Sequence, residues 1–338
     1  MNRKIRETGL VEDALNAFHQ ATGLKAEVVP RTPFPDAGVR IVKDGTKIVF
    51  PVAVKPALTN AAIGVMAQTY GHTNRRTLLV TGYVAPAMAD RLKELDIPFI
   101  DAAGNAYINE PRLLIFIKGN KKPDKYKAVE TGKTFKPAGI KVVFALLCNP
   151  GLEKRPYRAI AEQADVALGT VAAVMRDLEG RNLLLDMGEK GRRLTDKKDL
   201  LTRWVTAYPE QLRPKLRLGR FRAPAGNWWE DAVFNNQAYF GGEVAAHFIT
   251  KYLKPQVVTI YAFQPLGPLL LQNKLKQAAD GDIEILQVFW NFTCDRDRPG
   301  LVHPILVYAD LIAAGDERNI ETARMIYEKE LHRFIGPD

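Results

Sequence analysis

Three residues in the N-terminal third come close to the set that metal-dependent hydrolysis requires. Asp36 follows Pro35, and Lys55 lies two residues after Ala53 on a segment expected to be a strand. Cleavage of a phosphodiester with Mg²⁺ needs two carboxylates to hold the ion and a lysine beside the attacking water. Asp36 and Lys55 fit two of these roles, but Ala53 stands where the second carboxylate belongs. We therefore expect no catalysis, no metal and no cofactor here.

The layout of these residues resembles the PD-(D/E)xK nuclease superfamily. Pro35-Asp36 precedes a hairpin marked by Asp44-Gly45, and Ala53-Val54-Lys55 ends its second strand. The resemblance implies a restriction-endonuclease-like domain whose metal site is degenerate. Two alternatives stay open. Asp44 or Asp101 supplies the missing carboxylate and the chain is an active nuclease, or Pro35-Asp36 is a turn and Lys55 only ends a strand.

A second compact feature is the run from Phe99 to Tyr107, in which an Asp…Gly-Asn turn joins two strands. Gly104 and Asn105 both tolerate a positive φ, so the run is typical of a specialised turn. The alternative is that Asp101, at the end of a strand, lies in a cleft.

Basic residues are concentrated in the middle of the chain. The net charge is +10, yet residues 1–110 hold 13 Lys/Arg against 11 Asp/Glu. Residues 111–140 hold 8 against 2, residues 141–222 hold 17 against 10, and residues 223–338 hold 10 against 15. A localised basic region is the expected footprint of a domain that binds a polyanion.

The elements expected in this basic region form a winged helix-turn-helix. Ile140–Cys148, Tyr157–Ala164 and Leu168–Arg181 read as three helices, and Asp165-Val166-Ala167 makes the turn before the third. A hairpin with its tip at Gly188–Gly191 follows as the wing. The segment AIAEQADVALGTVAAVMRDLEGRNLL is similar to this motif in bacterial regulators. The alternative is a small domain of the same shape that serves protein contacts.

This motif places a set of side chains toward double-stranded DNA. The third helix buries Val171, Val174 and Leu178 and turns Thr170, Ala173 and Arg176 outward. Of the outward three, only Arg176 can make a bidentate contact with guanine. The residues suited to phosphates are Arg155, Arg158, Lys190, Arg192 and Arg193.

The fold class we expect is a multidomain α/β protein. Residues 1–120 form the nuclease-like domain, with helices and strands in the order α-β-β-β-α-β-α-β-β around a mixed sheet. The winged helix-turn-helix covers 137–212, and a C-terminal α/β domain covers 226–338. Polar, Pro- and Gly-rich stretches at 119–136 and 213–227 read as linkers.

The C-terminal part offers little chemistry. Glu243 suits the start of a helix, and Arg318 and Glu321 are spaced to form a surface ion pair. Neither the two cysteines, Cys148 and Cys294, nor the five histidines have the spacing of a metal site. Without an apolar run of about 20 residues or a signal peptide, we expect no membrane segment and a cytoplasmic location.

Together these features resemble the AbiEi family, the transcriptional regulators of type IV abortive-infection toxin–antitoxin systems. The residues that carry the resemblance are IPFIDAAGNAYI (97–108), the winged helix (140–195) and LVYADLIAAGDERNIETARMIY (306–327). The resemblance implies an antitoxin that represses its own operon and opposes a nucleotidyltransferase toxin without a stable complex. The chain departs from shorter members in that its winged helix is central and follows a nuclease-like domain.

The sequence thus predicts a DNA-binding regulator without enzymatic activity, acting on its own promoter. The alternative from another class is a metal-dependent nuclease that its winged helix targets to DNA. Ala53 separates the two, because only the regulator tolerates it.

Overall fold

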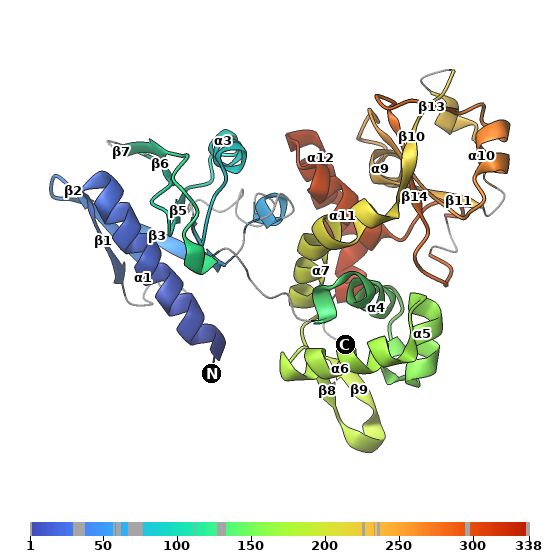
Figure 1. Cartoon of the computed structure of the whole chain (residues 1–338), viewed down its shortest axis with the longest axis horizontal. Helices are drawn as coiled ribbons and strands as arrows, with labels where there is room; N and C mark the ends of the chain where they lie inside the picture. Colours follow the sequence, from blue (N-terminus) through green and yellow to red (C-terminus); the bar gives the residue numbers. More distant parts are fainter. Residues whose placement is uncertain are drawn as a thin grey trace. The chain divides into compact units, whose positions relative to one another are not determined.

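The computed structural model describes residues 2–29, 38–56, 58, 62–66, 77–111, 113–126, 133–224, 227–232, 234, 237–294 and 298–335. The chain divides into two compact units, Met1–Glu130 and Thr131–Asp338 (Figure 1). Both units mix helices with sheet, so the chain is an α/β protein with several sheets, as expected.

A seven-stranded mixed sheet is the centre of the first unit. Its strands follow one another in chain order, with β3, β4 and β5 parallel and the other neighbours antiparallel. The elements are α1 (Asn2–Thr22), β1 (Lys25–Val29), β2 (Gly38–Lys43), β3 (Thr46–Lys55), β4 (Leu78–Thr81), α3 (Pro86–Glu94), β5 (Phe99–Asp101), β6 (Ala106–Glu110) and β7 (Leu113–Ile117). A helical segment also covers 62–66.

The two faces of this sheet bury two separate cores. Phe18 of α1 packs with Phe50 and Ile100 on one face, while Leu92 of α3 packs with Leu79 and Phe99 on the other. Side chains alternate between faces along a strand, so each buried strand supplies both cores. The mixed sheet and the order of elements as far as β5 agree with the sequence expectation, but the sheet has one strand more than the expected order, because both β6 and β7 follow β5.

The second unit begins with helices and a hairpin. The elements are η2 (Lys133–Phe135), α4 (Pro137–Cys148), η3 (Leu152–Lys154), α5 (Tyr157–Ala164), α6 (Leu168–Gly180), β8 (Leu184–Asp186), η4 (Gly188–Lys190), β9 (Arg192–Leu194) and α7 (Lys197–Gln211). We call α4, α5, α6 and the antiparallel hairpin β8–β9 the helix–hairpin segment. Asp196 caps α7 by accepting from the backbone N–H of Asp199 at 2.8 Å.

A five-stranded sheet with helices completes the second unit. Its order is β11-β12-β14-β10-β13, and only β12 and β14 are parallel. The elements are α8 (Arg213–Leu216), β10 (Arg217–Arg222), β11 (Ala238–Gly241), α9 (Gly242–Thr250), β12 (Val258–Ala262), α10 (Gly267–Gln272), β13 (Lys276–Gln277), β14 (Ile283–Gln287), α11 (Pro304–Ala314), α12 (Glu317–Ile326), η6 (Tyr327–Leu331) and α13 (His332–Ile335). We call residues 213–335 the sheet lobe.

One sequence expectation is wrong here. Residues 213–222, expected to belong to a linker, form α8 and β10, and β10 pairs with both β14 and β13. The stretch looks polar because arginines interrupt it. Two of them, Arg213 and Arg217, neutralise Glu284 of the neighbouring strand, so their charges belong inside the sheet lobe.

Aromatic side chains join the helix–hairpin segment to the sheet lobe within this unit. The ring of Phe144 in α4 stacks on Trp204 of α7, with centroids 5.1 Å apart. It also contacts Phe289, Trp290 and Phe292, which follow β14. The indole N–H of Trp204 donates to the carbonyl oxygen of Ile140 at 2.9 Å. Buried rings of this kind contribute large apolar areas, so helix α4 is fixed from both sides.

Candidate nucleic-acid interface

The turn between α5 and α6 depends on Asp165. Its backbone is left-handed, with φ of 50°, a conformation that Asp tolerates better than most residues. Lys141 of α4 donates to the Asp165 carboxylate at 3.1 Å and so connects the turn to helix α4. Since the turn is held in this way, the start of α6 has a fixed direction relative to α4 and α5.

Helix α6 has the predicted phase. Val171, Val174 and Leu178 are fully or almost fully buried, as the apolar spacing indicated. The outward side carries Arg176, which is exposed, and Thr170 and Ala173, which are half-buried. The Nε of Arg176 donates to the carbonyl oxygen of Ala172 at 3.2 Å, so its guanidinium lies along its own helix.

The hairpin is fastened to the start of α5 by Arg192. Its Nη2 donates to the carbonyl oxygen of Arg155 at 2.6 Å, and its guanidinium lies 4.4 Å from the centre of the Tyr157 ring. A cation above an aromatic face is attracted by the ring quadrupole. Arg192 therefore positions the hairpin, whereas its neighbour Arg193 is exposed to solvent.

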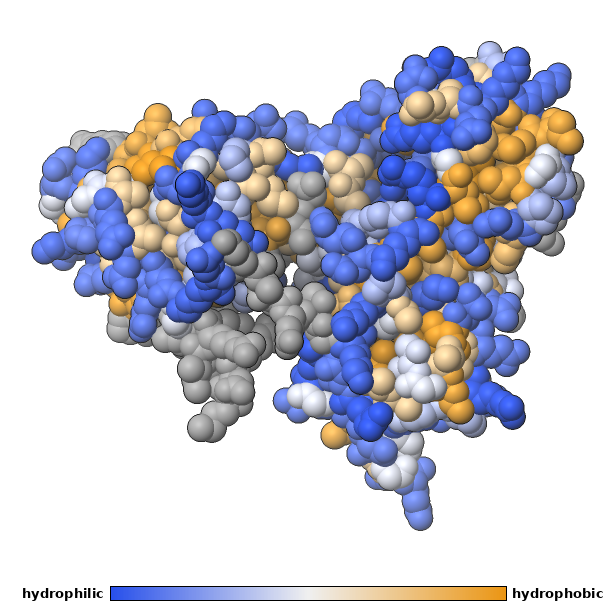
Figure 2. Space-filling view, viewed as in Figure 1, coloured by the Kyte–Doolittle hydropathy of each residue, from blue (hydrophilic) through white to orange (hydrophobic). Residues whose placement is uncertain are grey.

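Four of the cations predicted to contact phosphates are open to solvent in this segment. Arg155, Arg158, Lys190 and Arg193 are all exposed, and none of them makes an ion pair with another residue of the described chain. They come from the end of η3, from α5, from the hairpin tip and from β9. Figure 2 shows the largely hydrophilic surface of the hairpin, at the bottom of the view. Unpaired exposed cations around an outward helix are suited to contacts with phosphates.

The described residues hold only part of the expected hydrolytic set in the first unit. Asp36 lies outside the described residues. Ala53 is buried in the core on the α3 side, and Lys55 is the last residue of β3. Asp44 is the turn residue between β2 and β3, with φ of 47°. Among the described residues, no cluster of three or more His, Cys, Asp or Glu could hold a metal ion.

Asp101 is a turn organiser. Its two carboxylate oxygens accept four N–H groups at 2.8 Å, from the backbone of Val84, Ala103 and Asn105 and from the Asn105 side chain. The Asn105 side-chain oxygen in turn accepts from the backbone of Asn120 at 3.0 Å. Burial raises the pKa of Asp101 even though these bonds favour the ionised form. The residue types in the run Phe99–Tyr107 are therefore explained by the hydrogen bonds that hold its turn.

The sheet lobe contains a buried ionic cluster that the sequence did not predict. Arg213 of α8 contacts Asp310 of α11 at 3.0 Å and Glu284 of β14 at 2.7 Å, and both acids are almost fully buried. The hydroxyl of Tyr261 donates to Asp310 and lies 2.5 Å from that of Tyr208 in α7. A lone Asp within the apolar run of α11 was the sequence signal, since a buried carboxylate needs a partner.

The pKa values in this cluster follow from burial and from Arg213. Burial opposes ionisation of Glu284, but Arg213 and Arg217 hold its pKa below the ordinary value. For Asp310, burial prevails over the attraction of Arg213 and the pKa is raised. These contacts join α7 to α8, α11 and the sheet, which gives the cluster a structural role.

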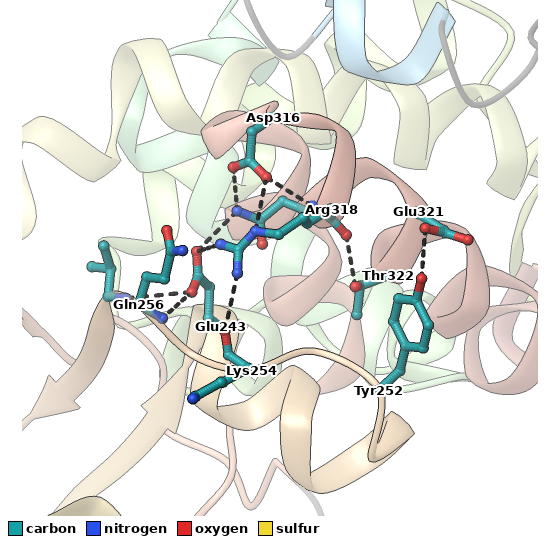
Figure 3. Close-up of polar contacts among 10 residues, drawn as sticks. Glu243, Tyr252, Lys254, Gln256, Asp316, Arg318, Glu321 and Thr322 are labelled. Atoms are coloured by element: carbon teal, nitrogen blue, oxygen red, sulfur yellow. Dashed lines mark hydrogen bonds and ion pairs between the residues drawn. The ribbon is translucent and has the colours of Figure 1, made fainter. Parts of the chain in front are cut away.

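The second polar network of the sheet lobe corrects an expectation (Figure 3). Arg318 does not pair with Glu321; it contacts Glu243 at 3.4 Å and donates to the carbonyl oxygen of Lys254 at 3.0 Å. Glu321 instead accepts from the hydroxyl of Tyr252 at 2.8 Å. Interactions with other parts of the chain thus replace the local i, i+3 pair.

Glu243, at the start of α9, is the centre of that network. Its buried carboxylate accepts from the backbone of Gln256 at 2.6 Å and from the Asn319 amide at 3.0 Å. It therefore links α9, the segment before β12, and the start of α12. These contacts satisfy the carboxylate and give it a structural role.

Comparison with known proteins gives one family match, which includes most of the sheet lobe. Residues 193–332 match the model of a family described as "Transcriptional regulator, AbiEi antitoxin, Type IV TA system". This match confirms the resemblance to AbiEi antitoxins for the part of the chain from β9 to α13. Helices α4, α5 and α6 lie before the matched range. No curated protein and no solved structure gave a significant match.

The described residues contain no helix that is both long enough and apolar enough to cross a lipid bilayer.

Proposed function

We propose that this protein is a DNA-binding transcriptional regulator that represses its own operon as the antitoxin of a type IV toxin–antitoxin system. The helix–hairpin segment is its winged helix-turn-helix, and α6 enters the major groove. The observation that carries the proposal is the set of four exposed, unpaired cations on the elements that precede and follow α6 in the chain, followed by residues that match AbiEi antitoxins.

The residues divide into two roles on DNA. Arg155, Arg158, Lys190 and Arg193 contact phosphates, which fixes the orientation of the protein but carries no sequence information. Arg176 contacts a guanine edge, while Thr170 and Ala173 approach neighbouring bases. Because two of these three side chains are small, one copy reads few bases.

The same proposal accounts for the antitoxin activity. By repressing the operon, the protein limits synthesis of a nucleotidyltransferase toxin, and it opposes that toxin in the cytoplasm without a stable complex. The first unit is a degenerate nuclease-like domain with no catalytic role. No contact of the described residues favours the nuclease alternative, because Ala53 has no carboxylate and the carboxylate of Asp101 is already fully hydrogen-bonded.

The test measures binding and cleavage side by side. Fluorescence anisotropy with the full chain compares a duplex from upstream of its own gene with a scrambled duplex of equal composition. We expect tighter binding to the upstream duplex. The proposal of DNA regulation would be refuted if the protein bound neither duplex. It would also be refuted if the affinities for the two duplexes were equal and did not depend on salt.

Cleavage is tested by incubating plasmid with the protein and Mg²⁺ or Mn²⁺. We expect intact plasmid. Metal-dependent cleavage that Lys55→Ala abolishes would establish the nuclease instead.

A further inference from the structure

The turn η2, which precedes the helix–hairpin segment, is folded tightly onto α6. The backbone N–H and the hydroxyl of Thr134 both donate to one carboxylate oxygen of Asp177, at 3.0 and 2.5 Å. Thr134 is fully buried, and Phe135 is almost fully buried with the Arg181 guanidinium 5.8 Å from its ring. Two bonds to one acidic residue of α6 therefore fix this turn against the helix.

Gly139 of α4 fixes the same turn from the other side. A Cβ at this position would lie 2.3 Å from the carbonyl oxygen of Lys133 and 2.5 Å from that of Thr134. Such distances are far inside van der Waals contact, so only glycine allows the backbone of η2 to approach α4 this closely. The turn is thus held between two helices.

This packing leaves two lysines at the edge of α6. Because Thr134 and Phe135 point inward, Lys133 and Lys136 are exposed, and neither makes an ion pair within the described chain. In Figure 1, the hairpin β8–β9 lies below α6, whereas the turn before α4 lies above it. In this view, the two elements that carry the exposed cations therefore lie on opposite sides of α6.

We propose that Lys133 and Lys136 form a second phosphate-binding edge, which contacts the DNA backbone on the flank of α6 opposite to the hairpin. The inference rests on the proposed function. A helix in the major groove lies between two sugar–phosphate backbones, so phosphates face it on both flanks. The hairpin serves one backbone and η2 serves the other. Asp177, Thr134 and Gly139 act as positioning residues that hold the two lysines in place.

The first experiment removes the two charges in the full chain. Lys133→Gln with Lys136→Gln is compared with Lys254→Gln with Lys276→Gln, which removes two exposed charges from the sheet lobe. Anisotropy titrations over a range of salt use the upstream and scrambled duplexes. Each phosphate contact contributes about 0.9 to the slope of log K against log[salt], so the first pair should make the slope shallower by about 2, equally on both duplexes. The control pair should leave the slope unchanged.

The outcomes separate this inference from the proposed function. A wild-type slope in the Lys133/Lys136 variant, together with a shallower slope in Arg193→Gln, would overturn the second edge and leave DNA binding by the hairpin intact. Absence of binding by the wild-type chain would overturn both.

A second experiment tests the positioning role through Thr134→Val, which keeps the backbone bond to Asp177 and removes the hydroxyl bond. We expect weaker DNA binding in the wild-type background and no further loss in the Lys133/Lys136 background. Circular dichroism checks that the variant folds. An equal loss in both backgrounds would show that Thr134 acts only on general stability and would contradict the positioning role.

Discussion

Arg192 and Arg193 are adjacent in β9, but the structure gives them different surroundings. Arg192 lies on the Tyr157 ring and donates to the carbonyl oxygen of Arg155, while Arg193 is exposed and makes no such contact. The sequence assigns both residues to phosphate contacts. The geometry instead suggests that Arg193 binds phosphate and that Arg192 chiefly orients the hairpin.

Single substitutions test this division of roles. Arg193→Gln should make the salt slope of DNA binding shallower by about 1 and leave thermal unfolding unchanged, because it removes one exposed charge. Arg192→Gln should lower the free energy of unfolding by about 1 kcal/mol, since it removes a cation–π contact and a hydrogen bond. Anisotropy and differential scanning calorimetry measure both. Identical behaviour of the two variants would contradict the distinction.

Arg176 is the residue on which base recognition depends. If its guanidinium leaves the Ala172 carbonyl to contact guanine, Arg176→Ala should cost about 1–3 kcal/mol on the cognate duplex and little on a scrambled one. Competition between the two duplexes measures this difference. Arg158→Ala serves as the matched control, because removal of a phosphate contact should weaken both duplexes alike. An equal loss for both duplexes with Arg176→Ala would make this residue another phosphate contact.

At the level of elements, the buried ionic cluster contributes to the stability of the sheet lobe. Arg213 faces two almost fully buried carboxylates, whereas Arg217 contacts only Glu284 and has half of its side chain exposed. Removal of one partner from a buried pair leaves an uncompensated charge and typically costs about 3–5 kcal/mol. An exposed pair contributes less than about 1 kcal/mol.

We therefore expect Arg213→Met to destabilise the chain by about 3–5 kcal/mol and Arg217→Met by less than about 1 kcal/mol. Urea unfolding followed by tryptophan fluorescence measures both, because Trp204 lies in the same unit as the cluster. Both variants lose an arginine that contacts Glu284, so a difference between them reports the loss of the contact with Asp310 and the deeper burial of Arg213. Equal and small effects would mean that the cluster contributes nothing to stability.

Elements with a regular apolar pattern could be predicted from the sequence, and elements stabilised by distant charges could not. Helix α6 was predicted with its buried face because Val171, Val174 and Leu178 recur at helical spacing. Strand β10 was missed because its arginines look like those of a linker until Glu284 is seen beside them. Arg318 was assigned the wrong partner for the same reason: Glu243 is distant in sequence.

The candidate site shows the same division. The types of its residues and the helix that carries them followed from the sequence. The attachment of Arg192 to α5, and of η2 to Asp177, depends on contacts between elements. Spacing along the chain cannot indicate such contacts, so the sequence did not distinguish a positioning residue from a phosphate contact.

At the scale of the whole molecule, charge is segregated along the chain. Residues 141–222 hold 17 Lys/Arg against 10 Asp/Glu, while residues 223–338 hold 10 against 15. Part of the positive charge is used internally, since Lys141, Arg181, Arg203, Arg213 and Arg217 form ion pairs. The charge available to a polyanion is therefore smaller than the composition suggests.

This distribution sets the expected salt dependence of DNA binding by the full chain. The four exposed cations of the helix–hairpin segment and the two lysines of η2 could contact about 4–8 phosphates with their neighbours, so log K should fall with log[salt] at a slope of roughly −4 to −7. Anisotropy titrations between low and physiological salt measure the slope. The scrambled duplex should give a similar slope at lower affinity, because phosphate contacts do not depend on sequence. A flat response would mean that these cations do not meet DNA, and the helix–hairpin segment would then have to be a protein-contact module.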